Sequence, residues 1–304
     1  MRVSTIIPTY NNESTISQAI DSALGQDFDD QEIIVVNDGS TDSTKSVLNS
    51  YGASIAVIEQ KNQGQPTARN AAIEHATGQH LAFLDADDIW LPGRLSKTVA
   101  ILDRNPAASL VFSDYVRINS VGMAIQASAV SAALAHPPTM DEILTHWWPI
   151  APTTVTVRRS IWERCGGFHT AATGFEDLYL FILAREHGEF EYVSEPLAKF
   201  RLGNSELGPD KWSPDVFLRL IKQRYGNRAR SLISEVRNHY AGAFACKALR
   251  AMERGNRSEA VRCWLEVFRY DPFYSFNIGR VARLFRRHNI RRIAQMLSPK
   301  SSGE

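Results

Sequence analysis

Four short apolar segments, each followed by a polar turn and then by residues with helical spacing, constrain the fold of this chain more than any other feature. The apolar segments span residues 3–8, 33–36, 54–59 and 81–84. The second of them, residues 33–36, is continuously apolar, as is typical of strands in parallel sheets that are covered on both faces. The alternation predicts a doubly wound α/β domain with right-handed crossovers, in which the loops that follow these strands lie on one rim of the sheet.

The fourth of these segments ends in a group of carboxylates. Residues 81–88 read Leu-Ala-Phe-Leu-Asp-Ala-Asp-Asp, so Asp85, Asp87 and Asp88 follow the strand directly. Closely spaced carboxylates repel one another, and a cation that prefers hard oxygen ligands, Mg²⁺ or Mn²⁺, would relieve the repulsion. Taken alone, however, an Asp-x-Asp motif is more often an acidic turn that caps the next helix.

A dinucleotide-binding dehydrogenase is the main alternative for such a domain, and the first loop argues against it. That fold needs glycines after the first strand so that the backbone can approach a pyrophosphate, whereas residues 8–13 here read Pro-Thr-Tyr-Asn-Asn-Glu. A phosphate loop of the Gly-x-x-x-x-Gly-Lys type is also missing. A bound diphosphate would therefore be neutralised by metal and by arginine, and Arg69 is well placed in the sequence to contribute.

Charge and cysteine usage exclude several other classes. The formal net charge is +1, which argues against bulk electrostatic capture of nucleic acid. The charge is uneven, because residues 276–297 hold six arginines and no acid. The three cysteines form no Cys-x-x-Cys pair, so we expect neither a zinc site nor a disulfide framework. With no apolar run of membrane-spanning length and no signal peptide pattern, the sequence favours a cytoplasmic protein.

Four segments, taken in order, resemble the signature of the family 2 inverting glycosyltransferases with the GT-A fold. They span residues 4–11, 36–40, 62–70 and 85–88. Four motifs in order are far more specific than any one of them. The resemblance implies a GT-A catalytic domain at residues 1–205, Rossmann-like with a mainly parallel sheet, followed by an all-helical C-terminal region at residues 206–304.

The resemblance also implies roles for individual residues. The nucleoside base of the donor would be bound by the loop after the first strand and the acid after the second, here Pro8, Thr9, Tyr10, Glu13 and Asp38. The ribose and the diphosphate would be bound by Asp85, Ala86 and Arg69, with Mn²⁺ or Mg²⁺ held by Asp85 and Asp87. For Asp88 two interpretations stay open, because it either orients the metal ligands or caps the turn toward Leu91-Pro92.

A second acidic motif lies at residues 174–181, where Glu176 and Asp177 start a predicted helix. The helix dipole favours carboxylates at that position whatever the function. The preceding Gly166-Gly167-Phe168 makes the motif similar to the acceptor side of the family, whose aspartate is the catalytic base. The resemblance therefore implies that Asp177 is the base of an inverting transfer and that Glu176 contacts substrate. No Gln-x-x-Arg-Trp follows Asp177, so single rather than processive transfer is expected.

Several other segments allow two interpretations. Residues 124–138 are either a mobile loop over the acceptor or a plain surface insertion, and Trp147-Trp148 either stacks on a sugar or belongs to the core. Residues 240–253 and 257–270 predict a helical hairpin similar to one tetratricopeptide unit. Residues 276–297 have a basic amphipathic pattern, which suits an anionic membrane surface or a packed helix equally well.

The sequence thus predicts an enzyme that moves a sugar from a nucleotide-diphosphate sugar to the hydroxyl of a glycan or lipid-linked acceptor in cell-surface polysaccharide biosynthesis. UDP-sugars are favoured because Asp38 can accept a hydrogen bond from N3–H of uracil. We expect such an enzyme in the cytoplasm or at the inner face of the cell membrane, with peripheral contact through residues 276–297. The alternative is a non-catalytic nucleotide-binding scaffold that acts through its helical C-terminal region.

Overall fold

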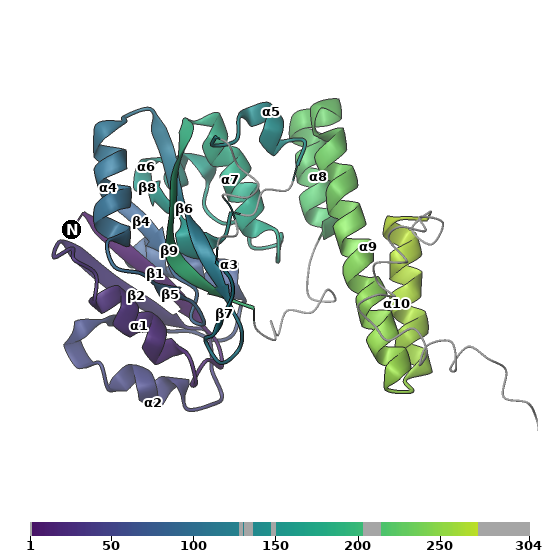
Figure 1. Ribbon diagram of the computed structural model, residues 1–304, viewed down its shortest axis with the longest axis horizontal. Coiled ribbons are helices and arrows are strands. Elements are labelled where there is room, and N and C mark those ends of the chain that lie inside the picture. Colours follow the sequence, from purple (N-terminus) through teal and green to yellow (C-terminus); the bar gives the residue numbers. More distant parts are fainter. Residues whose placement is uncertain (1, 128–129, 131–135, 147–149, 203–213, 273–304) are drawn as a thin grey trace, which may run out of the picture. The chain divides into compact units, whose positions relative to one another are not determined.

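The computed structural model describes residues 2–127, 130, 136–146, 150–202 and 214–272 (Figure 1). Trp147-Trp148 and the basic segment at 276–297 lie outside the described residues. The chain divides into two compact units, the first ending at Arg228 and the second beginning at Ala229.

The first four strands form the parallel half of the sheet, as predicted. They are β1 (Val3–Thr9), β2 (Gln31–Asn37), β3 (Ala56–Glu59) and β4 (His80–Phe83), in the order β3-β2-β1-β4. The connections contain α1 (Ile16–Leu24), α2 (Thr44–Asn49), a 3₁₀ turn (Gly52–Ser54) and α3 (Gln65–His75). Every residue of β1 is buried, and the parallel register that pairs Thr9 with Asn37 aligns the carboxyl ends of β1 and β2. The loops that follow these two strands are therefore neighbours.

The second half of the sheet is mixed rather than parallel throughout. It contains β5 (Ile89–Trp90), β6 (Ala108–Ile118), β7 (Ala124–Gln126), β8 (Thr156–Arg158) and β9 (Glu189–Arg201). Strand β8 lies antiparallel between β4 and β6, whereas β6 and β9 are parallel. Strand β9 is continuous through 13 residues, but its register with β6 shifts where Pro196 faces Asp114. Proline has no N–H to give to the ladder, which explains an irregularity at that point.

Helices and short turns complete the first unit. They are α4 (Arg94–Arg104), α5 (Met140–Ile143), a 3₁₀ turn (Pro152–Thr154), α6 (Arg159–Cys165), α7 (Glu176–Glu186) and α8 (Pro214–Tyr225). Helix α8 is joined to the rest of this unit by Phe217, which is fully buried and stacks on Phe175 with 5.1 Å between ring centroids. The first compact unit therefore extends past the domain boundary expected at residue 205.

The second unit contains the predicted helical hairpin. Helix α9 (Arg230–Glu253) and helix α10 (Arg257–Tyr270) are joined by a short turn in which the Asn256 side chain accepts a hydrogen bond from the Glu259 N–H. Tyr240 of α9 packs edge-on against Tyr270 of α10, with 4.5 Å between ring centroids. The hairpin prediction is confirmed, although α9 begins ten residues earlier than expected. No helix within the described residues is long and apolar enough to cross a membrane.

Candidate active site

The loops after β1 and β2 are fastened to each other by side chains. Asn11, which has a positive φ of 54°, accepts a hydrogen bond from Thr41 N–H at 2.8 Å. Glu13 accepts one from Ser43 N–H at 2.8 Å. Of the predicted base-binding residues, Pro8 and Thr9 are buried, Tyr10 is half-buried and Glu13 is exposed. The Glu13 carboxylate therefore has a structural role in joining the two loops, independent of any ligand.

The carboxylate of Asp38 is buried at the end of β2 and organises the next loop. It accepts hydrogen bonds from Gln60 Nε2 at 2.6 Å, Gln63 N–H at 2.9 Å and Gly64 N–H at 2.8 Å. The following residue, Gly39, has a φ of 76°, and a Cβ there would lie 2.8 Å from the backbone nitrogen of Asn62. Since a carboxylate has about four acceptor positions, these contacts leave Asp38 capacity for one further donor.

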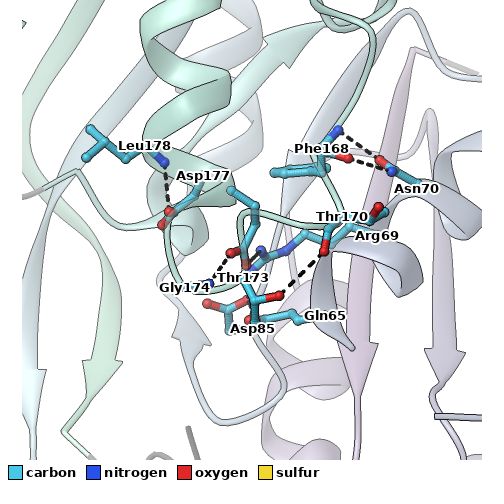
Figure 2. Close-up of polar contacts among 11 residues, drawn as sticks. Gln65, Arg69, Asn70, Asp85, Phe168, Thr170, Thr173, Gly174, Asp177 and Leu178 are labelled. Atoms are coloured by element: carbon cyan, nitrogen blue, oxygen red, sulfur yellow. Dashed lines mark hydrogen bonds and ion pairs between the residues drawn. The ribbon is translucent and has the colours of Figure 1, made fainter. Parts of the chain in front are cut away.

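Arg69 of α3 lies at the centre of the site and joins its two acidic motifs (Figure 2). Its side chain is 2% exposed, and its Nη2 donates to Asp85 Oδ1 at 2.7 Å while its Nη1 donates to Glu176 Oε1 at 3.3 Å. Burial alone would lower the pKa of Arg69, but the charges of Asp85 and Glu176 outweigh burial and raise it. The guanidinium is therefore firmly charged, and it connects the end of β4 to the start of α7.

The acidic turn after β4 has two kinds of carboxylate. Asp85 Oδ1 accepts hydrogen bonds from both Arg69 and Gln65, and Oδ2 takes no part in these bonds. Asp87 is half-buried, and no side chain among the described residues donates a hydrogen bond to its carboxylate. Asp88 is buried instead, and its Oδ1 accepts a hydrogen bond from Arg201 N–H at 2.8 Å. Asp88 thus attaches the turn to β9, rather than capping the chain toward Leu91-Pro92.

The electrostatics of this turn fit a hard cation. Burial, and then the charge of Asp85, raise the pKa of Asp87 to about 6. Burial, and then the charges of Asp87 and Asp85, raise the pKa of Asp88 well above its ordinary range. Carboxylates that resist ionisation because they are buried beside other carboxylates would be stabilised by an oxygen-preferring divalent ion. No cluster of three or more metal-ligating side chains occurs among the described residues, so Asp85 and Asp87 would supply only part of a coordination shell.

Asp177 lies in the first turn of α7, beside Glu176. Its Oδ1 accepts a hydrogen bond from Leu178 N–H at 2.7 Å, whereas Glu176 Oε2 accepts one from Gly174 N–H at 2.6 Å. Burial, and then the charge of Glu176, raise the pKa of Asp177 to about 7. A carboxylate with such a pKa can accept a proton near neutral pH, as a general base must.

Asn70 and Phe168, which sequence reasoning did not select, fasten the loop that precedes α7 to α3. The Asn70 side chain donates to the Phe168 carbonyl at 2.8 Å and accepts from the Phe168 N–H at 2.9 Å (Figure 2). The Phe168 ring lies under the Arg69 guanidinium, with 5.3 Å between Arg69 Cζ and the ring centroid. Gly167 has a φ of 80°, and a Cβ there would approach Asn70 Oδ1 to 3.2 Å. Asn70 stands next to Arg69, and Phe168 follows the double glycine. Both residues therefore belong to the motifs, and their position there could have indicated a role in the site.

The predicted residues therefore form one linked cluster and one separate group. Asp85, Arg69 and Glu176 are joined by direct ion pairs, and Asp177 adjoins Glu176 in the chain. Ala86 is buried within the acidic turn. Pro8, Thr9, Tyr10, Glu13 and Asp38 lie along the carboxyl ends of β1 and β2, and no direct bond connects them to Asp85 within the described residues.

Comparison with known sequences identifies the family. The sequence profile described as Glycosyl transferase family 2 matches residues 4–166, which is more than half of the chain. The chain belongs to glycosyl transferase family 2. The resemblance seen in the four motifs is confirmed, and with it the expected enzyme class, a glycosyltransferase.

Two of the relatives have names that state a biosynthetic or enzymatic role. The putative teichuronic acid biosynthesis glycosyltransferase TuaG of Bacillus subtilis is 31% identical over 220 residues, covering 69% of this chain and 82% of TuaG. The Escherichia coli protein named UDP-Glc:alpha-D-GlcNAc-diphosphoundecaprenol beta-1,3-glucosyltransferase WfgD is 37% identical over 120 residues, covering 39% of this chain and 47% of WfgD. An uncharacterized glycosyltransferase of Nostoc is 40% identical, but the match spans only 36% of either protein.

Solved structures support the fold class. Staphylococcus aureus TarS, residues 1–349 in complex with UDP-GlcNAc, has a TM-score of 0.62 at 19% identity, covering 88% of this chain and 90% of that one. The mannosyltransferase PcManGT from Pyrobaculum calidifontis, in complex with GDP-Man and Mn²⁺, has a TM-score of 0.53 at 18% identity, covering 97% and 83%. The expected GT-A-like fold with a helical C-terminal region is confirmed.

Proposed function

We propose that this family 2 glycosyltransferase moves a sugar, with inversion and with the help of a divalent metal, from a nucleotide-diphosphate sugar to an acceptor hydroxyl. The observation that carries this proposal is the bridge from Asp85 through Arg69 to Glu176, which brings the acidic turn of β4 next to the start of α7. A donor held at the first motif would thereby lie beside the proposed base, Asp177.

In the proposed mechanism Asp177 accepts the proton of the acceptor hydroxyl as its oxygen attacks the anomeric carbon. Attack opposite the departing diphosphate inverts that carbon. The raised pKa of Asp177, about 7, matches this task near neutral pH. Arg69 supplies a positive charge beside Asp85, where the diphosphate would lie. Because the Arg69 side chain is already buried and paired, it does not have to reorganise during the reaction.

The metal would be held by Asp85 and Asp87, whose crowded carboxylates fit Mn²⁺ or Mg²⁺. When bound, the ion supplies positive charge that stabilises the departing diphosphate. The structure of PcManGT was solved with Mn²⁺, which agrees with this assignment. Asp88 orients the acidic turn through Arg201 and need not contact the ion.

The proposed donor is a UDP-sugar. Asp38 retains one acceptor position, which suits N3–H of uracil, and half-buried Tyr10 stands nearby in the same pair of loops. Guanine can also donate to a carboxylate, and PcManGT binds GDP-Man, so GDP-sugars are the next class to test together with dTDP-sugars. The UDP-GlcNAc complex of TarS and the UDP-Glc in the name of WfgD favour UDP.

The proposed acceptor is a glycan or lipid-linked intermediate of a cell-surface polysaccharide, as the names of WfgD and TuaG suggest. Such an acceptor would place the reaction at the cytoplasmic face of a membrane. The predicted contact through residues 276–297 lies outside the described residues and stays a prediction. The chain spans about a third of the first curated relatives that it matches, so the activity of the whole protein is part of this proposal.

Slow transfer of the sugar to water provides a direct test of the function. With Mn²⁺ and no acceptor, we expect the purified protein to release nucleoside diphosphate from a panel of UDP-, dTDP-, GDP- and CDP-sugars, fastest from a UDP-sugar. Calorimetric titration with the four nucleoside diphosphates should give the same order. Tightest binding of GDP would reject the proposed base preference. No release from any donor, with or without acceptor extracts, would favour the non-catalytic scaffold.

Replacing Asp87 tests the metal site. Asp87→Ala should weaken donor binding in Mn²⁺ while leaving the metal-free affinity nearly unchanged, because the variant removes a metal ligand and no direct contact to the nucleoside. Asp103→Ala is a matched control, since Asp103 pairs with Arg2 next to the opposite end of β1. Titration of UDP by calorimetry with Mn²⁺ and with a chelator measures both affinities. A Mn²⁺ dependence as strong as that of the wild type would contradict the assignment.

A further inference from the structure

Helix α10 is apolar on two sides: one side is buried, and the other exposes large apolar side chains. Ala260, Cys263, Val267 and Tyr270 are the buried residues of the helix, which packs against α9. On the other side, Val261 is 60% exposed, Leu265 63% and Phe268 45%, and Trp264 is half-buried. We call Val261, Trp264, Leu265 and Phe268 the α10 stripe.

The spacing of the α10 stripe makes it one continuous surface. Its members stand at positions i, i+3, i+4 and i+7 of an α-helix, which places them in a single row. The rings of Trp264 and Phe268 lie 6.3 Å apart and support each other. Single exposed apolar residues are ordinary, but a row of four that includes two aromatic rings marks an interaction surface.

The charge around the α10 stripe indicates what covers it. Arg257, Arg262 and Arg269 are exposed on the same helix, Arg269 being paired with Glu266 at 3.3 Å. Residues 229–304 contain fifteen Lys and Arg against six Asp and Glu, a formal charge of +9, whereas residues 1–228 carry −8. An apolar, aromatic row with arginines around it, in a strongly basic unit, has the composition of helices that lie in the headgroup region of anionic membranes.

We propose that the α10 stripe is a contact surface for an anionic lipid bilayer. Trp264, Leu265 and Phe268 enter the boundary between headgroups and acyl chains, and Arg257 and Arg262 lie against lipid phosphates. Two alternatives fit the charge less well. Two copies that met through the same stripe would oppose one unit of +9 to another. Residues 273–304 are themselves rich in arginine and carry the same sign as the arginines of α10.

Trp264 makes the proposal testable on the intact protein, because residues 273–304 contain no tryptophan. Vesicles of phosphatidylglycerol and phosphatidylcholine that carry bromine on their acyl chains should quench Trp264 fluorescence, measured as the difference between the wild type and Trp264→Phe. Vesicles of phosphatidylcholine alone should not quench it. If Trp264 is not quenched while the protein sediments with the anionic vesicles, another segment makes the contact and the proposal is wrong.

A pair of charge-neutral variants tests the apolar contact. Leu265→Ser/Phe268→Ser should lower the partition coefficient onto anionic vesicles by at least about tenfold. The control Leu24→Ser/Val57→Ser removes two exposed apolar side chains of the first unit and should bind as the wild type does. Thermal melts verify that both variants fold. Equal binding of the α10 variant and the wild type would overturn the proposal, since a purely electrostatic polyanion site would not need Leu265 or Phe268.

The same variants separate this proposal from its alternatives. If the α10 stripe joined two copies, light scattering would show a wild-type dimer that the α10 variant converts to a monomer, and this outcome would also overturn the proposal. Donor hydrolysis by the α10 variant should equal that of the wild type, because Leu265 and Phe268 belong to the second unit. The membrane proposal is therefore tested separately from the proposed catalytic function.

Discussion

Asp177→Asn should lower turnover by about 10²–10⁴ while leaving the affinity for the donor nearly unchanged. The substitution preserves the shape of the side chain and removes its ability to accept a proton. Turnover is measured with donor and acceptor, and donor affinity by titration of UDP with Mn²⁺. Equal losses of donor affinity in Asp177→Asn and Asp87→Ala would overturn the division of roles between the two carboxylates.

The pH dependence gives this prediction a second readout. Because burial and Glu176 raise the pKa of Asp177 to about 7, wild-type turnover should fall as the pH falls below about 7. Asp177→Asn should lose that limb of the pH profile.

The free energy of unfolding should change in the opposite sense, because it should rise as the pH falls. A carboxyl group with a raised pKa contributes its full stabilisation at a pH below its ordinary pKa of 3.8. This contribution is lost as the pH rises through about 7. At pH 8 the Asn variant should therefore be at least as stable as the wild type.

Arg69→Met should destabilise the protein by about 3–5 kcal/mol and abolish donor binding. Methionine fills much of the space, but Asp85 and Glu176 lose the cation that neutralises them within a buried cluster. Denaturant unfolding measures the loss of stability, and titration of UDP with Mn²⁺ measures the loss of donor binding.

Arg94→Met is the matched control for this substitution. Arg94 is also fully buried, but it donates to the carbonyls of Thr153 and Val155, with Trp90 below its guanidinium. Its removal leaves no carboxylate without a partner, so its cost should be smaller. A loss of stability in Arg69→Met no larger than that in Arg94→Met would mean that packing, and not charge neutralisation, is the main contribution of Arg69.

The parallel half of the fold could be predicted from the sequence because its information is local. The apolar strands and the helical periodicity between them lie within the first 90 residues and specify β1 to β4 without reference to the rest of the chain. The mixed half was harder to predict. Strand β8 has only three residues, and it reaches its place between β4 and β6 through long-range pairing that a three-residue pattern cannot encode.

The candidate site divides in the same way. The motifs indicated Asp85, Arg69, Glu176 and Asp177 individually, but the ion pair between Arg69 and Glu176 joins residues 107 positions apart, and no local pattern specifies it. The attachment of Asp88 to Arg201 and of Asn70 to Phe168 was missed for the same reason. Asp38 and Glu13 show a further difficulty, because both accept hydrogen bonds that organise neighbouring loops. The sequence alone does not distinguish such a structural carboxylate from one that binds a ligand.

The bonds of Arg201 have a consequence for synthesis on the ribosome. Arg201, the last residue of β9, donates from its backbone to Asp88, from its side chain to the Asp87 carbonyl, and also to Gln18 of α1. The acidic turn is made early in translation, yet these three bonds cannot form until 113 further residues have followed Asp88. While these residues are added, the emerging chain exposes the Asp88 carboxylate without its partner in β9, and the acidic turn is fastened only when β9 joins the sheet.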